Sequence, residues 1–264
     1  MKSLITLSML CVWGAAAVRA EPAAERLMNA TFKIFNPDST ATGFLVRDPA
    51  PDAPRTNVVL VTANHVFSKA KGDHVLLVCR VRDEAGGWRR LDHKVPIRDG
   101  TNALWTCHPS QDVAVIRCRL PPQAVFDALP AEAVADEKAA VASGLSIGDA
   151  LFYCSYPHRI EADAAGFPLL RTGAVSGYPL FPVSGHPTVF FSGATFAGDS
   201  GAPVAVAAPG GEPPLRVVGL IVLRTQHNDH LKSDEWDLTF KRDIGLGSFV
   251  HAAYIAECLD ALAR

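Results

Sequence analysis

Short β-forming segments recur along most of the chain, and this pattern limits the possible fold more than any other feature. The segments are rich in Val, Ile, Leu, Phe and Thr and lie between turn-forming residues. Such spacing is typical of an all-β sandwich or barrel. A first series covers residues 31–35, 42–47, 57–62, 74–81, 91–97 and 112–120. A second series covers residues 150–156, 168–178, 188–192, 203–207, 215–223 and 238–249.

Residues 121–148 separate the two series. This stretch contains three prolines and is rich in Ala, Glu and Asp, so we expect a linker. Residues 250–262 instead carry apolar side chains at helical spacing. The sequence therefore predicts an all-β fold with two six-stranded antiparallel barrels, at about 29–120 and about 149–249, followed by a C-terminal helix at about 250–262.

The N-terminal segment has the pattern of an export signal. Met1 and Lys2 precede an apolar run over residues 4–18, and Val18 and Ala20 are small residues at the two positions that signal peptidase reads. We expect residues 1–20 to be removed, leaving a secreted or periplasmic chain of residues 21–264; an uncleaved anchor is the alternative. The formal charge of −2 gives no basic excess for binding nucleic acid or an anionic membrane.

Five cysteines remain after removal of the segment that holds Cys11, namely Cys79, Cys107, Cys118, Cys154 and Cys258. Export favours disulfide bonds, but an odd number leaves at least one thiol free or paired with another molecule. No Cys-x-x-Cys pair occurs, so we expect no zinc or redox site. A chain of this length buries a core without a metal, and we expect no cofactor.

Three short motifs contain the residue types needed for nucleophilic catalysis. Ser200 lies in Gly-Asp-Ser-Gly between two apolar segments, and a serine becomes a strong nucleophile when a histidine takes its proton. His65 ends a buried segment in Thr-Ala-Asn-His, and Asp112 begins an apolar one. Asp92 and Asp99 are alternatives to Asp112 on spacing alone, although neither begins an apolar segment as cleanly.

These motifs resemble those of trypsin-like, chymotrypsin-fold serine proteases. Thr-Gly-Phe-Leu-Val at 42–46, Thr-Ala-Asn-His at 62–65, Asp-Val-Ala-Val at 112–115 and Gly-Asp-Ser-Gly at 198–201 follow the order of that family. Val-Gly-Leu-Ile at 218–221 and Asp-Ile-Gly-Leu-Gly at 243–247 are most similar to bacterial HtrA-like peptidase domains. The resemblance covers about residues 29–262, and no PDZ-like domain follows.

The resemblance implies a role for each residue. Ser200 would attack the scissile carbonyl, His65 would act as general base, and Asp112 would orient the imidazole. The backbone N–H groups of Gly198 and Ser200 would form the oxyanion hole. The pocket for the residue before the cleaved bond would be lined by Ala194, Thr195, Val222, Leu223 and Arg224. With no acidic residue at position 194, we expect cleavage after a small or medium apolar residue rather than after Lys or Arg.

One departure from the better-known members concerns activation. Glu21 would be the new N-terminus, and it is not the apolar residue whose ammonium pairs with the aspartate beside the nucleophile in activated zymogens. We therefore expect local donors to satisfy Asp199 without zymogen cleavage.

The remaining histidines lack the surroundings of a catalytic group. We expect His93, His108, His158 and His186 to be surface or turn residues. Residues 227–230, His-Asn-Asp-His, are expected to form a polar loop rather than a metal site.

The sequence as a whole thus predicts a serine endopeptidase that acts on protein or peptide substrates. An α/β-hydrolase esterase is excluded because Ala202 breaks the Gly-x-Ser-x-Gly elbow. A catalytically silent trypsin-fold module, with a binding or regulatory role, is the alternative.

Overall fold

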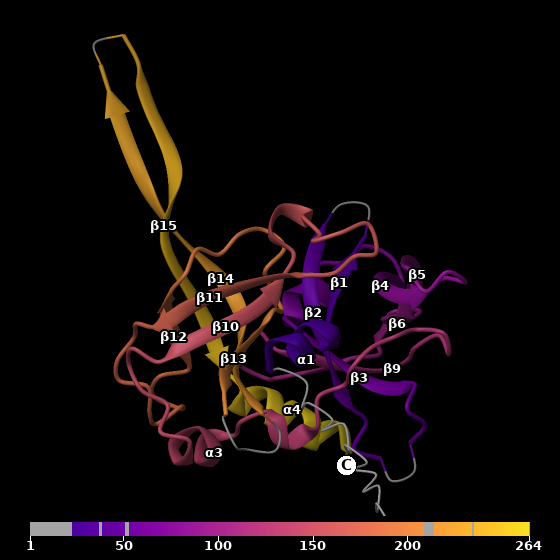
Figure 1. Cartoon of the computed structure of the whole chain (residues 1–264). Helices are drawn as coiled ribbons and strands as arrows, with labels where there is room; N and C mark the ends of the chain where they lie inside the picture. Colours follow the sequence, from indigo (N-terminus) through magenta and orange to yellow (C-terminus); the bar gives the residue numbers. More distant parts are fainter. Residues whose placement is uncertain (1–22, 37–38, 51–52, 209–213, 234, 264) are drawn as a thin grey trace, which may run out of the picture.

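The structure, a computed structural model, describes residues 23–36, 39–50, 53–208, 214–233 and 235–263, with the side chains of 223–225 excepted. The expected signal peptide, residues 1–20, and Cys11 lie outside the described residues. The described part of the chain is mostly β and consists of an open sheet followed by a closed barrel (Figure 1).

The first half of the chain forms a seven-stranded antiparallel sheet in the order β5-β4-β1-β2-β3-β9-β8. Its strands are β1 (Thr31–Phe35), β2 (Thr40–Arg47), β3 (Asn57–Thr62), β4 (His74–Arg82), β5 (Trp88–Pro96), β8 (Thr106–Cys107) and β9 (Ala114–Arg119). All six predicted segments are strands of this sheet, but the predicted first barrel is not confirmed, because the sheet does not close. Between β5 and β9 the chain forms the two-residue β8 and a small hairpin, β6 (Arg98–Asp99) with β7 (Asn102–Ala103), which are too short to join the two edges.

The second half of the chain forms the predicted six-stranded closed barrel, in the order β10-β11-β12-β15-β14-β13. Its strands are β10 (Ala150–Ser155), β11 (Leu169–Val175), β12 (Thr188–Ser192), β13 (Pro203–Ala207), β14 (Leu215–Lys232) and β15 (Asp237–His251). Strands β14 and β15 are longer than predicted and leave the barrel as a projecting hairpin (Figure 1). The expected polar loop at 227–230 is therefore part of a strand.

The predicted C-terminal helix is confirmed as α4 (Ala253–Ala263). The expected linker contains a 3-10 turn, η1 (Ala131–Ala133), and a short helix, α3 (Glu137–Ala142). The sequence did not predict α1 (Ala23–Ala30), α2 (Asn64–Ser68) or the 3-10 turn η2 (Pro157–Arg159). Among the described residues, no helix is both long and apolar enough to span a membrane.

Strand β3 shows why its segment of the sequence is continuously apolar. Side chains alternate between the two faces of a strand. Val58 and Leu60 pack into the core of the first sheet, whereas Val59 and Val61 pack into a second core between the sheet and the barrel. We call this second core, between the sheet and the barrel, the seam. Both faces of β3 are thus buried, and the seam holds the sheet and the barrel together as one unit.

Arg80 reinforces the seam from the first sheet. Its guanidinium is fully buried and donates to the carbonyls of Thr31 at 3.0 Å and Asn29 at 2.9 Å. The rings of Phe32 and Phe167 lie over it at 4.3 and 4.7 Å. Because Phe167 belongs to the second half of the chain, this one cation connects the two halves.

All five described cysteines are free thiols, so the structure contains no disulfide bond among the described residues. Burial raises the pKa of Cys79, Cys118, Cys154 and Cys258 to about 12 in each case. A thiol with so high a pKa is mostly protonated near neutral pH and reacts slowly.

Candidate active site

His65 and Asp112 form a two-point contact at the start of α2. The backbone N–H of His65 donates to Asp112 Oδ1 at 2.8 Å, and the ring Nδ1 lies 2.5 Å from Asp112 Oδ2. The first N–H groups of a helix have no partner within the helix, and here a carboxylate accepts one of them. Asp112 therefore fixes both the backbone and the ring of His65.

The charge on Asp112 determines which nitrogen of His65 carries a proton. Burial alone raises the pKa of Asp112, but hydrogen bonds from the His65 ring and backbone outweigh it and lower the pKa below its usual value. An ionised carboxylate can only accept hydrogen bonds. Nδ1 must therefore be the donor in the neutral ring, which leaves Nε2 as an acceptor.

Two side chains hold the helix that carries His65. Arg98 donates to the carbonyls of Phe67 and Ala70 at 3.0 Å each, at the end of α2. The indole N–H of Trp105 donates to the Asn64 side chain at 2.9 Å. A cation at a helix C-terminus is favourable for the helix, so α2 is held at both ends.

His108 shapes the turn that precedes Asp112. Its Nδ1 accepts from the backbone N–H groups of Ser110 at 3.2 Å and Gln111 at 3.0 Å, and its Nε2 lies 3.0 Å from Glu257 on α4. Asp112 itself lies just before β9 rather than at its first residue. The expectation that His108 is a surface or turn residue missed this role, because the sequence gives no sign of its contact with α4.

The loop that carries Ser200 docks on the first sheet through Thr42. The Thr42 N–H donates to the Ser200 carbonyl at 2.9 Å, and the Thr42 hydroxyl donates to the Gly198 carbonyl at 2.7 Å. The Thr62 hydroxyl in turn donates to the Thr42 carbonyl at 2.7 Å. Thr62 lies only three residues before His65. The loop thus lies against β2 and the end of β3, but no hydrogen bond joins Ser200 to His65 among the described residues.

Gly201 is required by this close docking. Its φ is +89°, and a Cβ there would lie 2.0 Å from the Thr42 carbonyl oxygen and 2.2 Å from the Thr62 hydroxyl. Any larger residue would push the loop away from the sheet.

Gly198 has a backbone conformation that favours glycine. Its φ is +103°, and a Cβ would lie 2.1 Å from the Tyr156 carbonyl oxygen. The Ala197 carbonyl accepts from the His158 N–H at 2.7 Å, so the Gly198 N–H, on the other side of the same peptide plane, points away from His158. Among hydrogen bonds between described residues, neither the Gly198 nor the Ser200 N–H has an acceptor.

The turn that donates to Ala197 is strained and tied to the first sheet. His158 and Arg159 have φ values of +51° and +70° in the left-handed region. The Lys33 ammonium lies 3.0 Å from the Arg159 carbonyl and 2.5 Å from Glu161, which also pairs with Arg90 at 3.0 Å. Such contacts keep residues in a conformation that is unfavourable by itself. His158 is exposed and in a turn, as expected.

Asp199 has partners on one of its two carboxylate oxygens, whereas its buried Oδ1 has no hydrogen-bond partner among the described residues. The carboxylate is completely buried, and its Oδ2 lies 2.5 Å from Arg171 Nη2 and accepts from the Phe196 N–H at 2.7 Å. Arg171 also donates to the Ala194 carbonyl at 3.0 Å and the Ser155 hydroxyl at 2.6 Å. Nothing in the sequence marked Arg171, since it lies far from the motif on another strand.

The expected substrate-pocket residues are described in part. Thr195 is buried, and its hydroxyl has no hydrogen-bond partner among the described residues. Its Cγ2 lies 2.6 Å from where a Cβ on Gly247 would be, so Thr195 packs directly on β15. Ala194 and Val222 are half-buried, whereas the side chains of Leu223 and Arg224 lie outside the described residues.

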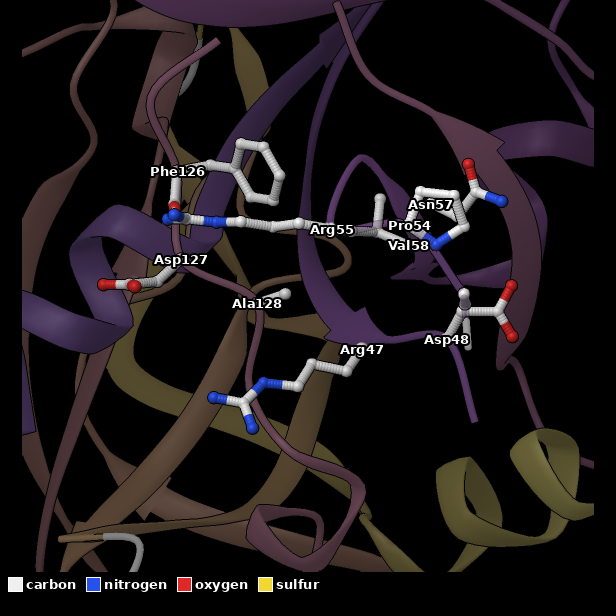
Figure 2. A pocket seen from close by; sticks show the side chains of 10 residues that line it. Arg47, Asp48, Pro54, Arg55, Asn57, Val58, Phe126, Asp127 and Ala128 are labelled. Atoms are coloured by element: carbon white, nitrogen blue, oxygen red, sulfur yellow. The ribbon is translucent and has the colours of Figure 1, made fainter. Parts of the chain in front are cut away.

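Two cavities differ in their relation to these residues. One of about 320 Å³ adjoins the expected oxyanion hole and is lined by Ser39, Thr40, His158, Arg159, Ala197 and Gly198. A second of about 420 Å³ lies at the other end of β2 and β3, where Arg55 extends across it toward Phe126 (Figure 2). The first cavity is therefore the one next to the candidate chemistry.

The other candidate side chains lie outside this constellation. Asp92, an alternative to Asp112, pairs instead with Arg90 at 2.5 Å. In the part of the chain that the structure describes, no three His, Cys, Asp or Glu side chains gather closely enough to hold a metal ion.

No model of a known protein family matches the chain, and no curated protein matches its sequence. The function is therefore inferred from the geometry and chemistry of the candidate site.

Removal of Arg171 tests the buried pair. Arg171→Met leaves the Asp199 carboxylate without a counter-charge, and we expect the free energy of unfolding in urea to fall by about 3–5 kcal/mol. The matched control, Arg242→Met, removes an arginine that is 62% exposed and pairs with Asp229, and it should cost about 1 kcal/mol or less. Equal losses in the two variants would show that the Arg171 pair stabilises the protein no more than an exposed pair does.

The lowered pKa of Asp112 predicts a pH-dependent contribution to stability. Because folding favours the ionised form, this contribution is complete above the unfolded pKa of about 3.9 and is lost as the pH falls through the lower folded value. Urea unfolding at several pH values should therefore show a difference between wild type and Asp112→Asn that shrinks below about pH 4. Asp260→Asn, which removes an exposed carboxylate, controls for the lost charge. A difference that stays constant with pH would contradict the assignment.

Proposed function

We propose that the chain is a serine endopeptidase that hydrolyses peptide bonds of protein or peptide substrates through Ser200, His65 and Asp112. The observation that carries the proposal is the two-point contact of Asp112 with His65. It is joined by the docking of the Ser200 loop on Thr42, which accepts a hydrogen bond from Thr62 at the end of the strand that leads into His65. This arrangement supports a chymotrypsin-like relation between the sheet and the barrel, with the reacting groups at the seam.

The reaction follows from the protonation states. His65 Nε2 accepts the Ser200 hydroxyl proton as the oxygen attacks the carbonyl carbon, and it later donates this proton to the leaving amine. Asp112, held ionised, stabilises the imidazolium that forms in between. Water then hydrolyses the acyl-enzyme by the same route.

The N–H groups of Gly198 and Ser200 would stabilise the negative charge that develops on the carbonyl oxygen. One such donor typically contributes about 3 kcal/mol in the transition state. Support comes from the two carbonyls that fix the loop, since Ala197 accepts from His158 and Gly198 accepts from Thr42. Because these contacts and the Arg171–Asp199 pair are already made, the enzyme would need no zymogen cleavage.

Export to the periplasm or the medium remains part of the proposal, on the strength of the N-terminal sequence pattern. The proposed chemistry requires no metal or cofactor.

A fluorophosphonate probe tests the proposed nucleophile. We expect it to label the purified protein at Ser200, and we expect Ser200→Ala to abolish labelling and lower peptide hydrolysis by as much as about a million-fold. Ser146→Ala, which removes an exposed hydroxyl, should leave both unchanged. Folded wild-type protein that neither takes the label nor cleaves peptides would instead favour a catalytically silent binding or regulatory module.

The pocket residues predict the specificity. Ala194 supplies no carboxylate, and Thr195 packs on Gly247, so a small or medium apolar side chain fits best before the cleaved bond. Digestion of a peptide library should show such residues preferred over Lys and Arg by at least about tenfold. Cleavage mainly after Lys or Arg would refute this pocket.

A further inference from the structure

Strands β14 and β15 continue well beyond the barrel. The pairing of β13 with β14 ends at Pro203↔Leu220, and the pairing of β12 with β15 ends at Ser192↔Leu246. Farther out, β14 and β15 pair only with each other, as far as Lys232↔Asp237. We call residues 226–233 and 235–244 the ribbon, which projects away from the rest of the molecule (Figure 1).

One face of the ribbon carries most of its apolar side chains, and they are exposed. Leu231 lies opposite Leu238, and the alternation of side chains places Phe240 on the same face. Ile244 and, at the tip of the ribbon, Trp236 also lie on this face. These five side chains are 38–52% exposed. The other face is polar throughout and consists of Gln226, Asn228, His230, Lys232, Asp237, Thr239, Lys241 and Asp243.

Such a segregated face is unfavourable in water. Single exposed apolar residues are common on protein surfaces, but four neighbouring ones on a projecting hairpin, Leu231, Trp236, Leu238 and Phe240, are not. Ile244 lies beyond Arg242 on the same face. A two-stranded hairpin is also only marginally stable unless its apolar face packs against something. Within the part of the chain that the structure describes, the ribbon extends away from the barrel and the sheet (Figure 1).

The charges on the apolar face limit what can cover it. Arg242 Nε lies 2.7 Å from Asp229 Oδ2 on this face, and His227, opposite Arg242, lies 3.6 Å from Asp229 Oδ1. Beside the imidazole, the face therefore contains one cation and one anion. This balance gives no attraction to an anionic membrane or to nucleic acid. It is instead self-complementary, because a two-fold axis can place Arg242 of each copy near Asp229 of the other while the apolar rows meet.

We propose that the ribbon is a dimerisation arm, whose apolar face packs against the same face of a second copy of this chain. A strand advances about 3.3 Å per residue, so the apolar face is about 26 Å long. Its five apolar side chains are 38–52% exposed, so covering them would bury on the order of 500 Å² of accessible surface on each copy, or about 1,000 Å² in total, which is the lower end for specific interfaces. The dimer is therefore reversible, with a Kd in the micromolar range or weaker.

The arm also connects the dimer to the proposed active site. Gly201 N–H donates to the Ile221 carbonyl at 2.7 Å, so β14 contacts the nucleophile loop at the base of the ribbon. Two arms packed together would stand at the edge of each site. The dimer itself does not depend on catalysis.

Sedimentation velocity on the purified protein, from about 1 to about 200 µM, tests the proposal. We expect the mass to rise with concentration to twice that of the monomer. Leu238→Glu/Phe240→Glu should remain monomeric over this range. The matched control, Asn228→Glu/Thr239→Glu, adds the same charge to the polar face and should dimerise like wild type.

A mixing experiment shows whether the charges meet between copies. Arg242→Asp and Asp229→Arg should each weaken self-association at least about tenfold, because like charges then face one another. An equimolar mixture of the two variants should form a heterodimer more strongly than either variant forms a homodimer. A purely internal pair would give no such gain.

A wild-type protein that stays monomeric at about 200 µM would overturn the proposal, as would an apolar-face variant that dimerises normally. A monomer whose Trp236 emission shifts on adding phosphatidylcholine vesicles or an unfolded polypeptide would assign the face to a membrane or to substrate instead.

Discussion

The hydrogen bonds of Thr42 across the seam are the contacts on which the candidate site depends. Through its N–H, hydroxyl and carbonyl, this residue connects the Ser200 carbonyl, the Gly198 carbonyl and the Thr62 hydroxyl. The histidine belongs to the sheet and the serine to the barrel. Contacts between the two halves must position these side chains, and Thr42 supplies two of them, to the Ser200 and Gly198 carbonyls. Its third hydrogen bond, from Thr62, lies within the sheet.

A buried or half-buried carboxylate lies on each side of the seam. Asp112, held ionised, orients His65, whereas Asp199 is neutralised by Arg171 beside the nucleophile. Asp112 contacts His65, and Asp199 directly precedes Ser200, but the two carboxylates differ in exposure to solvent. The Asp112 side chain is 34% exposed, whereas the Asp199 side chain is 1% exposed. This difference suits a catalytic role for the first and a structural role for the second.

Much of this organisation follows from local sequence patterns. Strands β1, β3, β12 and β13 have the predicted bounds, because each is a short β-forming segment between turn residues. Whether the first sheet closes into a barrel could not be predicted in this way. Closure depends on the lengths of β6, β7 and β8, and their residues have no apolar periodicity. The long ribbon was also not predicted, as its polar residues at 227–230 were interpreted as a loop. Similarly, Arg171 and His108 act through contacts between distant segments, and nothing in their own sequence neighbourhood marks them. Thr42 begins a motif that the sequence did single out, but its hydrogen bonds to the Ser200 loop depend on the fold.

A peptidyl chloromethyl ketone tests the central geometric claim directly, because in a serine protease it reacts first with the catalytic serine and then alkylates the catalytic histidine. The account predicts that mass spectrometry of the treated protein will find the alkyl group on His65 and on no other of the nine histidines. It also predicts that Ser200→Ala will lose this modification. Alkylation of His65 at an unchanged rate in Ser200→Ala, or labelling spread over other histidines, would contradict the claim that the two side chains act together.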